Sequence, residues 1–284
     1  MDRIRGKTME CTKTENGILF KNVNDLDLAQ TLDCGQSFRW EQQENGDFKG
    51  VAFDREVTVR LIGSDFYIIG GKEEDSELWS EYFDLDFNYA AVRDELSDLS
   101  GVLKSAASYA PGIRILKQDS WEALCSFIIS QNNNIPRIKG IIKRLCENFG
   151  DKTVEGGCTF PDARRLAELS VEDLSPLRSG FRAKYLIDAA QKVASGEVNL
   201  DDIKTMPTDE ARRALMMIKG VGPKVAECAL LYGMHRLECF PMDVWMKRAM
   251  AVLLPEFGVE DLGDYAGIAQ QYIFHYSRMH PELF

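Results

Sequence analysis

The sequence has no run of apolar residues long enough to cross a membrane, and no apolar stretch follows the basic residues near its start. A membrane helix needs about 20 apolar residues, so we expect a soluble, unprocessed protein with no membrane partner. Cysteine pairs of the CxxC kind are also missing, because the seven cysteines are scattered along the chain. They predict reduced, mostly buried thiols in a cytosolic protein.

Positive charge is scarce as well. The net charge of −11 argues against nucleic-acid binding if the chain is taken as a whole. The imbalance is local, however, because residues 73–98 contain ten acidic residues and one base, whereas residues 112–150 and 178–192 each carry a net charge of +3. A basic face on an acidic body can bind DNA, with an affinity that is expected to be weak and strongly salt-dependent.

Two hydrophobic patterns divide the chain. Up to about residue 70 a period near two predicts antiparallel strands at 25–32, 37–41, 48–53, 56–61 and 66–69. Beyond that, a period of 3.6 predicts helices at 85–96, 101–109, 120–130, 135–149, 161–169, 171–177, 183–195, 208–218, 223–232, 244–254 and 265–279. The predicted fold class is α+β, with an N-terminal antiparallel β-rich domain and its flanking helices in residues 1–105. A larger all-α domain follows in residues 106–284.

A Gly-Val-Gly turn joins two of the predicted helices within residues 208–233. Pro223 follows the turn, and its fixed φ suits the first position of a helix. Gly220 and Gly222 are expected to take positive φ and to let the backbone approach a ligand, while the unpaired N–H groups that open the second helix favour a phosphate. The unit therefore predicts a helix-hairpin-helix that grips a nucleic-acid backbone.

Two residues near this hairpin are candidates for catalysis. Lys224 lies in the first turn of the second helix, where the helix dipole disfavours a second positive charge and so favours the nucleophilic amine. Asp243 comes nineteen residues later, directly before the helix predicted at 244–254. Each alone has a simpler interpretation, Lys224 as a solvated lysine and Asp243 as an N-cap. The ordered pair favours catalysis.

Three further polar segments stand out. Gly35 lies between two predicted strands, where a glycine lets a ligand approach the backbone or simply bends the chain. The asparagines at 132–134 predict a loop that caps the next helix, with Pro136 at its start. The amides beside Arg137 can also hydrogen-bond bases exposed in an opened duplex. A comparable set is the aromatic–arginine pair of Phe181 and Arg182, which follows a glycine at the start of a predicted helix.

In this order the segments resemble the 8-oxoguanine DNA glycosylases of the helix-hairpin-helix superfamily. The motifs are GQSFRW (35–40), RILKQDSWEALCSFIISQNNNIPRIKG (114–140), GFRAKY (180–185), KGVGPKVAEC (219–228), PMDVW (241–245) and YAGIAQQYIF (265–274). The resemblance implies a bifunctional DNA N-glycosylase and abasic-site lyase of base excision repair. Such an enzyme flips 8-oxoguanine out of duplex DNA opposite cytosine, cleaves its N-glycosidic bond and nicks the strand by β-elimination.

The resemblance also implies a role for each motif residue. Lys224 would be the amine that attacks the sugar and forms a Schiff base, and Asp243 would stabilise the cationic sugar. The base pocket would have four residues: a carbonyl that accepts the N–H that distinguishes 8-oxoguanine from guanine, two side chains that sandwich the base, and one that reads its Watson–Crick edge. They are, in that order, Gly35, Cys228 with Phe274, and Gln270.

Other residues would contact the rest of the duplex. The resemblance implies contacts from Asn132, Arg137 and Arg182 to the stranded cytosine, a wedge at Phe181, and phosphate contacts at Gly220 and Gly222. It also implies a structural monovalent or divalent cation on the backbone carbonyls of Met216, Ile218 and Val221. No cofactor is expected for the chemistry, and no iron–sulfur cluster, because no cysteine follows Cys239. The small size suits a bacterial member, expected as a monomer in the cytoplasm and on the nucleoid.

Some positions depart from the family pattern: Trp245 replaces a histidine of the animal members, Phe181 a tyrosine, Tyr232 a frequent methionine and Gln131 a serine. Two alternatives stay open. One is a glycosylase for an alkylated base or an oxidised pyrimidine, against which Gly35 and Phe274 argue. The other is a non-catalytic DNA-binding module, against which the Lys224 and Asp243 pair argues. A lysine-dependent aldolase is remote, since the chain shows no barrel repeat.

Overall fold

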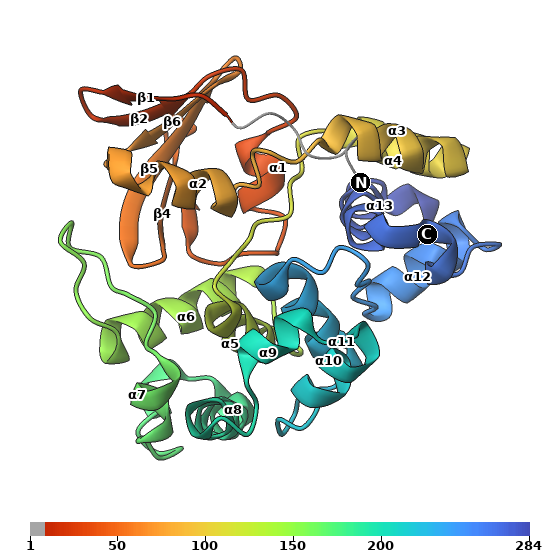
Figure 1. The fold of residues 1–284 in the computed structure, drawn as a ribbon. Helices are drawn as coiled ribbons and strands as arrows, with labels where there is room; N and C mark the ends of the chain where they lie inside the picture. The colour runs from red at the N-terminus through yellow and green to blue at the C-terminus, as the bar shows by residue number, and fades with distance from the viewer. Residues whose placement is uncertain (1–8) are drawn as a thin grey trace.

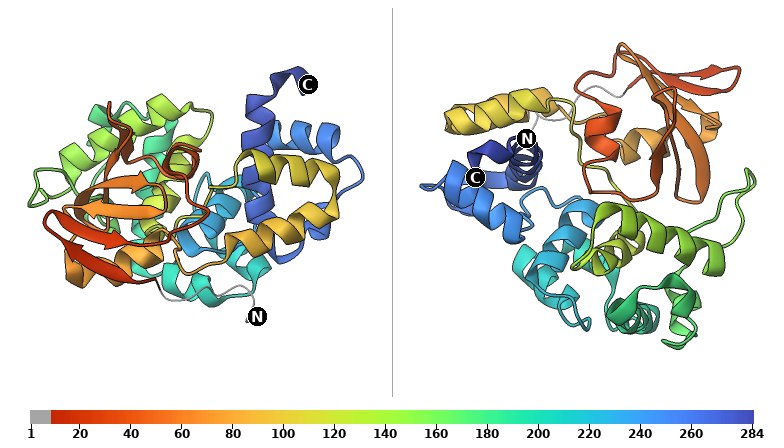
Figure 2. Two further views of the ribbon diagram at one scale, coloured as in Figure 1. Left: turned by 90° about the horizontal axis from the view of Figure 1, so that it is seen from above. Right: turned by 180° about the vertical axis from the view of Figure 1, so that it is seen from behind.

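The computed structural model describes residues 9–284. A β-sheet and a body of helices lie side by side, as Figure 1 and the two further views in Figure 2 show. The six strands have the order β1-β2-β6-β5-β4-β3, and every neighbouring pair is antiparallel. They are β1 (Cys11–Thr14), β2 (Gly17–Phe20), β3 (Trp40–Gln42), β4 (Phe48–Ala52), β5 (Arg55–Ile62) and β6 (Asp65–Ile69).

Three of the predicted strands are confirmed, at β4, β5 and β6, while the predicted strand at 37–41 overlaps β3 only at its end. The prediction of a strand at 25–32 is wrong, because helix α1 (Leu28–Leu32) forms there. Asp27 is the N-cap of α1, and its carboxylate accepts a hydrogen bond from the Gln30 N–H at 2.8 Å. This local cap outweighs the alternating pattern.

Aromatic side chains hold the sheet against helix α2 (Ser76–Tyr82), which the helix prediction missed. Trp79 and Phe83 are fully buried, and the Phe83 ring meets that of Phe66 edge-on with centroids 4.8 Å apart. The Trp40 indole N–H donates to the Tyr82 hydroxyl at 2.8 Å. Burial of each such ring contributes about 1.5–3 kcal/mol, so this cluster anchors the sheet.

The remainder of the chain is helical, as predicted. The helices are α3 (Tyr89–Leu99), α4 (Gly101–Tyr109), α5 (Ser120–Ser130), α6 (Ile135–Phe149), α7 (Ala163–Ala167), α8 (Ala183–Ser195), α9 (Leu200–Thr205), α10 (Thr208–Leu215), α11 (Pro223–Cys228), α12 (Val244–Leu253) and α13 (Ala266–Met279). The predicted division at residues 105 and 106 falls within α4. It stays a prediction, since α4 also packs against α13.

Some helix predictions need correction. Only a 3-10 turn (Ser175–Leu177) forms within the predicted helix at 171–177, where Pro176 lacks the N–H that an α-helix would use. The helix predicted at 161–169 is the shorter α7, and α9 was missed. The helix predicted at 223–232 divides into α11 and a π-helical turn (Ala229–Gly233). Such turns often occur at functional sites.

An extended segment between α4 and α5 ties the sheet to the helices. Arg114 is buried in it and donates to the backbone carbonyls of Asn24, Asp25 and Asp84 at 2.6–3.0 Å. Gln36, which is fully buried, donates to the Arg114 carbonyl at 2.7 Å and accepts from the Leu116 N–H at 2.9 Å. The loop that carries Gly35 is therefore fixed against the start of the helical body.

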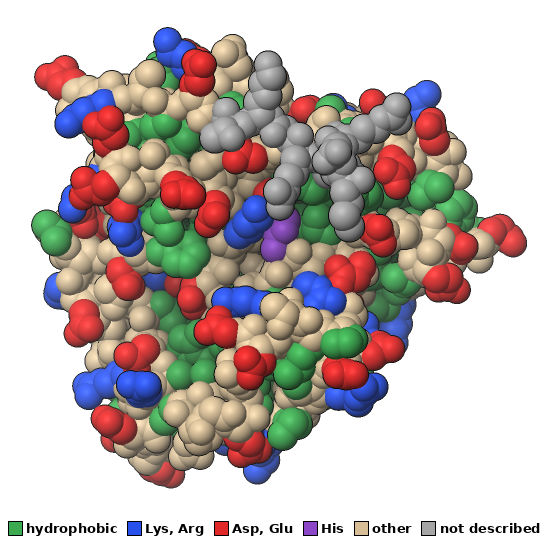
Figure 3. Space-filling view, in the orientation of Figure 1, with side chains coloured by type: hydrophobic (Ala, Val, Ile, Leu, Met, Phe, Trp, Pro, Cys, Tyr) green, Lys and Arg blue, Asp and Glu red, His purple; other side chains and the backbone are tan. Residues whose placement is uncertain are grey.

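A charged cluster lies near the same junction. The Asp84 carboxylate is buried and accepts from the Lys117 amino group at 2.8 Å and from the Tyr89 hydroxyl at 2.9 Å, and it pairs with the His235 ring at 3.1 Å. Burial raises the pKa of Asp84, but the hydrogen bond and charge of His235, with the charge of Lys117, outweigh it and lower the pKa below its usual value. Elsewhere on the face drawn in Figure 3, acidic and basic side chains are interspersed.

Candidate active site

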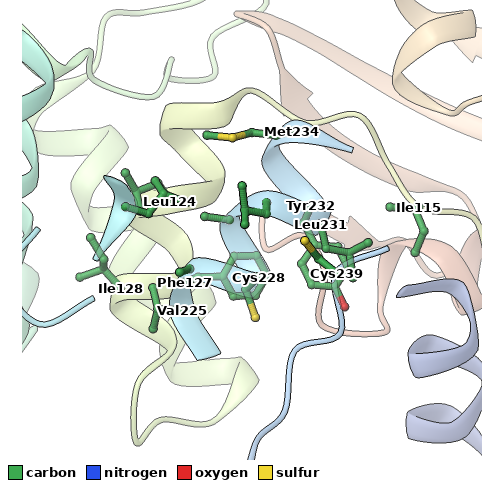
Figure 4. Close-up of a cluster of buried hydrophobic side chains, with 14 of the residues drawn as sticks. Ile115, Leu124, Phe127, Ile128, Val225, Cys228, Leu231, Tyr232, Met234 and Cys239 are labelled. Carbon is green, nitrogen blue, oxygen red and sulfur yellow. The ribbon is translucent and has the colours of Figure 1, made fainter. Parts of the chain in front are cut away.

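A pocket of about 430 Å³ opens between the Gly35 loop, α5, α11 and α13. All six residues predicted to act in catalysis or to contact the base line it: Lys224, Asp243, Gly35, Cys228, Gln270 and Phe274. They come from four separate stretches of the chain. Figure 4 shows how Phe127 of α5 and Val225, Cys228 and Tyr232 pack together beside it. The structure thus brings together residues that the sequence placed far apart.

The hairpin between α10 and α11 supplies Lys224. Gly220 has φ 81°, as predicted, and a Cβ there would lie only 2.4–2.5 Å from carbons of the Tyr185 ring, so only glycine fits without a shift. The prediction of a positive φ at Gly222 is wrong: its φ is −97° and its ψ −178°, because it is the N-cap of α11 and such residues are extended. A Cβ on Gly222 would meet no atom within 4 Å, so its backbone faces open space.

Lys224 is half-buried in the pocket wall. Its amino nitrogen lies 5.4 Å from the centroid of the Phe127 ring. Burial raises the pKa of the Cys228 thiol one turn further along, whereas the positive charge of Lys224 and a hydrogen bond from it act in the opposite sense. The amine and the thiol are therefore close together, and the Cys228 side chain is a neutral, polarisable surface.

Asp243 precedes α12 and caps it. Its carboxylate accepts from the Met246 N–H at 2.7 Å, which confirms the predicted N-cap. The segment before it is held by Glu227, which accepts from the Phe240 N–H at 2.8 Å and from the Arg212 guanidinium at 2.6 Å. Sequence reasoning missed Glu227, although an acidic residue among the apolar residues of α11 was a visible signal.

Gly35 has φ 88°, a conformation that favours glycine. Gln36 beside it is tied to the Thr31 and Arg114 carbonyls at 2.8 and 2.7 Å. The backbone at Gly35 is thus presented to the pocket by a fixed loop. Sequence reasoning missed the role of Gln36, which follows Gly35 directly in the GQSFRW motif.

The residues predicted to contact the opposite base lie around the asparagine loop. Asn132 and Arg137 are exposed, and Phe181 is 45% exposed. Arg182 differs, because it is only 3% exposed and donates to the backbone carbonyls of Gln131 (2.8 Å), Asn132 (2.9 Å) and Ser179 (3.2 Å). Its guanidinium also lies 4.5 Å from the centroid of the Phe181 ring. Arg182 therefore holds the asparagine loop in place through its hydrogen bonds to the backbone carbonyls of Gln131 and Asn132.

A second hollow of about 520 Å³ continues from the pocket along the hairpin. It is lined by the asparagine loop, by Gly222–Val225, by Met242–Trp245 and by Lys247. Its lining shares five residues with that of the pocket: Ser130, Asn133, Lys224, Asp243 and Trp245. The pocket and this second hollow, which we call the groove, thus meet around the two candidate catalytic residues.

Trp245 and Arg278 lie at the edge of the pocket. The Trp245 indole N–H donates to the Ser277 hydroxyl at 2.8 Å. The Arg278 guanidinium carbon lies 5.8 Å from the ring centroids of both Trp245 and Phe274. Arg278 was not predicted, and only its spacing of one helical turn from Phe274 signals it.

The predicted cation on the hairpin carbonyls stays a prediction. The Ile218 carbonyl already accepts the Val221 N–H at 3.0 Å, which leaves one lone pair for a cation. Within residues 9–284, no group of three His, Cys, Asp or Glu side chains is placed to bind a metal. Over the same range, no helix is both long and apolar enough to span a membrane.

A lysine and a carboxylate at a pocket beside a helix-hairpin-helix define a class, the helix-hairpin-helix base excision DNA repair proteins. Comparison with family descriptions agrees. Residues 18–124 match the 8-oxoguanine DNA glycosylase N-terminal domain, and residues 125–255 match the HhH-GPD superfamily of base excision DNA repair proteins. The chain belongs to the N-glycosylase/DNA lyase family of 8-oxoguanine DNA glycosylases. The predicted family and the predicted α+β fold are confirmed.

Individual relatives show how far the likeness extends. The N-glycosylase/DNA lyase of Saccharomyces cerevisiae is 34% identical over 262 residues, which cover 82% of this chain and 69% of the yeast protein. A probable N-glycosylase/DNA lyase of Methanothermobacter thermautotrophicus is 32% identical, and the match covers 90% of this chain and 95% of that protein. The Clostridium acetobutylicum 8-oxoguanine glycosylase/lyase was solved with DNA containing cytosine opposite 8-oxoguanine. Its structure superposes on this chain with a TM-score of 0.89 at 38% identity, and the match covers 98% of this chain and 99% of that one.

Proposed function

We propose that this protein excises 8-oxoguanine from duplex DNA opposite cytosine and then nicks the strand, with Lys224 as nucleophile. One observation carries the proposal: Lys224, Asp243 and the four predicted base-contact residues line a single pocket. The substrate is supported by the C. acetobutylicum relative, which was solved with this base pair in its DNA.

In this mechanism the damaged nucleotide turns out of the duplex and its base enters the pocket between Cys228 and Phe274. The lone pair of the Lys224 amine forms a bond to C1′ of the sugar while the C1′–N9 electrons leave with the base, which takes up a proton. The carboxylate of Asp243 stabilises the positive charge on the sugar. Because Asp243 is held as an N-cap, its position is set before the substrate arrives.

The sugar ring then opens, and the C1′–lysine adduct becomes a Schiff base. Loss of a proton from C2′ allows the C3′–O bond to break, so the 3′ phosphate leaves with the bonding electrons. Water finally releases the sugar fragment from Lys224. The active site needs no cofactor for these steps.

The groove would hold the remainder of the duplex. Asn132 and Arg137 are exposed beside the pocket and free to approach the unpaired cytosine, whereas the Arg182 guanidinium fixes the loop that carries Asn132. The half-exposed Phe181 ring would fill the space that the flipped base leaves. The backbone N–H groups of Gly220 and Gly222 would bind phosphate, and a cation on the carbonyls of Met216, Ile218 and Val221 would strengthen that contact.

Borohydride trapping tests the proposal. The intact protein and Lys224→Gln are incubated with a duplex carrying 8-oxoguanine opposite cytosine, with an undamaged duplex beside it. We expect a covalent adduct and free 8-oxoguanine from the intact protein only. Lys219→Gln is the matched control, since Lys219 is an exposed lysine of the same hairpin that lies outside the pocket lining, and it should still form the adduct at saturating enzyme.

Two outcomes would replace the proposal. Adduct formation on duplexes with alkylated bases or oxidised pyrimidines, but not with 8-oxoguanine, would assign a different lesion. DNA binding without product from any lesion would assign a non-catalytic binding module.

A further inference from the structure

Three polar side chains form a closed set of hydrogen bonds in the pocket wall. They are Tyr232, Gln270 and Gln271, which are 3%, 5% and 3% exposed. The Gln270 amide oxygen accepts from the Tyr232 hydroxyl at 3.3 Å and from the Gln271 amide nitrogen at 2.9 Å. The same Gln271 nitrogen donates its second proton to the Tyr232 oxygen. Both lone pairs of the Gln270 oxygen are therefore occupied.

This arrangement determines which end of the Gln270 amide faces the pocket. The Gln270 nitrogen lies 3.5 Å from the Pro241 carbonyl, so a reversed amide would place two oxygens against each other. A reversed Gln271 amide alone would likewise place its oxygen 2.9 Å from that of Gln270, and reversal of both amides would still set the Gln270 oxygen against the Pro241 carbonyl. With its oxygen fully used, Gln270 has an N–H as the group it can offer to a ligand.

Gln271 maintains this arrangement although its own oxygen is left without a partner. That oxygen is buried and accepts no hydrogen bond from any described residue. A buried acceptor without a partner is unfavourable for folding. Both Gln271 N–H groups nevertheless donate to Tyr232 and Gln270. The unpaired Gln271 oxygen is thus an unfavourable feature that accompanies the two hydrogen bonds orienting the Gln270 amide.

Tyr232 is a dependable donor in this set. Its ring stacks on that of Phe127 with centroids 5.1 Å apart, and Figure 4 shows the two side chains beside Cys228. Burial raises the pKa of Tyr232 well above its usual range, so the hydroxyl keeps its proton. The π-helical turn Ala229–Gly233 fixes the backbone from which it projects.

We propose that Tyr232 and Gln271 are positioning residues that make Gln270 a hydrogen-bond donor toward the flipped base. The inference rests on the proposed function and adds a specificity to it. A fixed donor favours a purine whose edge carries an acceptor, such as the 6-oxo group of 8-oxoguanine. It rejects 8-oxoadenine, whose 6-amino group is itself a donor, because two donors then face each other without acceptors.

The test compares kcat/KM for excision of 8-oxoguanine and of 8-oxoadenine, each opposite cytosine. Tyr232→Phe keeps the stack on Phe127, and Gln271→Met keeps an unbranched side chain. Each variant removes one hydrogen bond to the Gln270 oxygen, so the Gln270 amide can rotate to the reversed orientation. We expect the ratio of the two kcat/KM values to fall about tenfold in each variant, the effect of one hydrogen bond. Equal ratios, within twofold, in the intact protein and both variants would overturn the proposal.

Tyr272→Phe is the matched control. Tyr272 follows Gln271 in α13 and is fully buried, but it does not line the pocket. It should keep the intact ratio. A general loosening of α13 would lower the ratio in this variant too, and that result would also count against a specific role for Tyr232 and Gln271.

A measurement on the free protein separates this inference from the proposed function. With ¹⁵N-labelled glutamine, the side-chain amide protons of Gln270 are followed by NMR without DNA. We expect slow exchange with solvent in the intact protein and faster exchange in Tyr232→Phe. Equal exchange in both would refute the orienting hydrogen bonds. If the intact protein excises neither base, the proposed function fails, and the exchange rates alone decide whether Gln270 is held.

Discussion

Asp243 has two tasks that can be separated by substitution. Its carboxylate caps α12 through the Met246 N–H at 2.7 Å, and the proposed mechanism uses the negative charge of the same group. Asparagine can keep the cap but not the charge, whereas alanine loses both. Asp243→Asn should therefore change the free energy of unfolding by only a few tenths of a kcal/mol, and Asp243→Ala should lower it by about 1 kcal/mol.

The two variants should lose activity alike. Removal of a preorganised electrostatic group at a developing charge slows reactions by about 10²–10³-fold, and we expect that fall in single-turnover excision for both. In thermal melts, the Tm of Asp243→Ala should lie about 2–4 °C below that of Asp243→Asn. If Asp243→Asn excised at the intact rate, the carboxylate would have no part in the chemistry. If both variants melted together, the cap would contribute nothing.

Asp119 offers a matched control for the same experiment. It is the N-cap of α5, accepts from the Glu122 N–H at 2.9 Å and lies outside the pocket lining. Asp119→Asn and Asp119→Ala should show the same difference in stability as the Asp243 pair, with excision unchanged. A fall in excision with Asp119→Ala would mean that loss of a cap alone disturbs the site.

Two further predictions concern the hairpin and the charged cluster. Gly220→Ala should destabilise the protein by more than about 1 kcal/mol in melts, because of its positive φ and the Tyr185 ring, whereas Gly222→Ala should cost less and mainly weaken DNA binding in a titration. Equal destabilisation would contradict the assigned conformations. Because the pKa of Asp84 is lowered in the folded state, chiefly by His235, its stabilising effect should be complete above its unfolded pKa of about 3.9 and be lost as the pH falls through the folded value. The difference in unfolding free energy between the intact protein and Asp84→Asn should thus shrink in acid, and a difference that is constant from pH 7 to pH 3 would refute the lowered pKa.

The sequence predicted local chemistry better than long-range contacts. Lys224 and Asp243 could be found because each lies at the start of a helix within a short motif, Lys224 in the first turn of α11 and Asp243 as the N-cap of α12. Gly222 was misjudged because a glycine does not reveal whether its place is a turn or an extended N-cap. The helix at Leu28–Leu32 was missed because one cap at Asp27 outweighed an alternating pattern.

Contacts between segments far apart in the sequence limit what could be predicted from the sequence alone. Arg182 was predicted as a base contact, which stays a prediction, and no local pattern reveals that its guanidinium also donates to carbonyls some fifty residues earlier. Gln271 stands beside Gln270 in the sequence, yet only the position of Tyr232 shows how the two amides are turned. Side-chain direction depends on the packed neighbours, so it becomes visible only in the folded chain.

The spread of the pocket along the chain has a consequence for synthesis. Gly35 is synthesised before Lys224, and Gln270 and Phe274, which lie in α13, are synthesised after both. Domains generally fold from the N-terminus during synthesis, so a nascent chain has Lys224 and the hairpin before it has all of the residues that line the pocket. Under the proposed function, a chain that stops before α13 would therefore lack Gln270 and Phe274, two of the four residues proposed to contact the base.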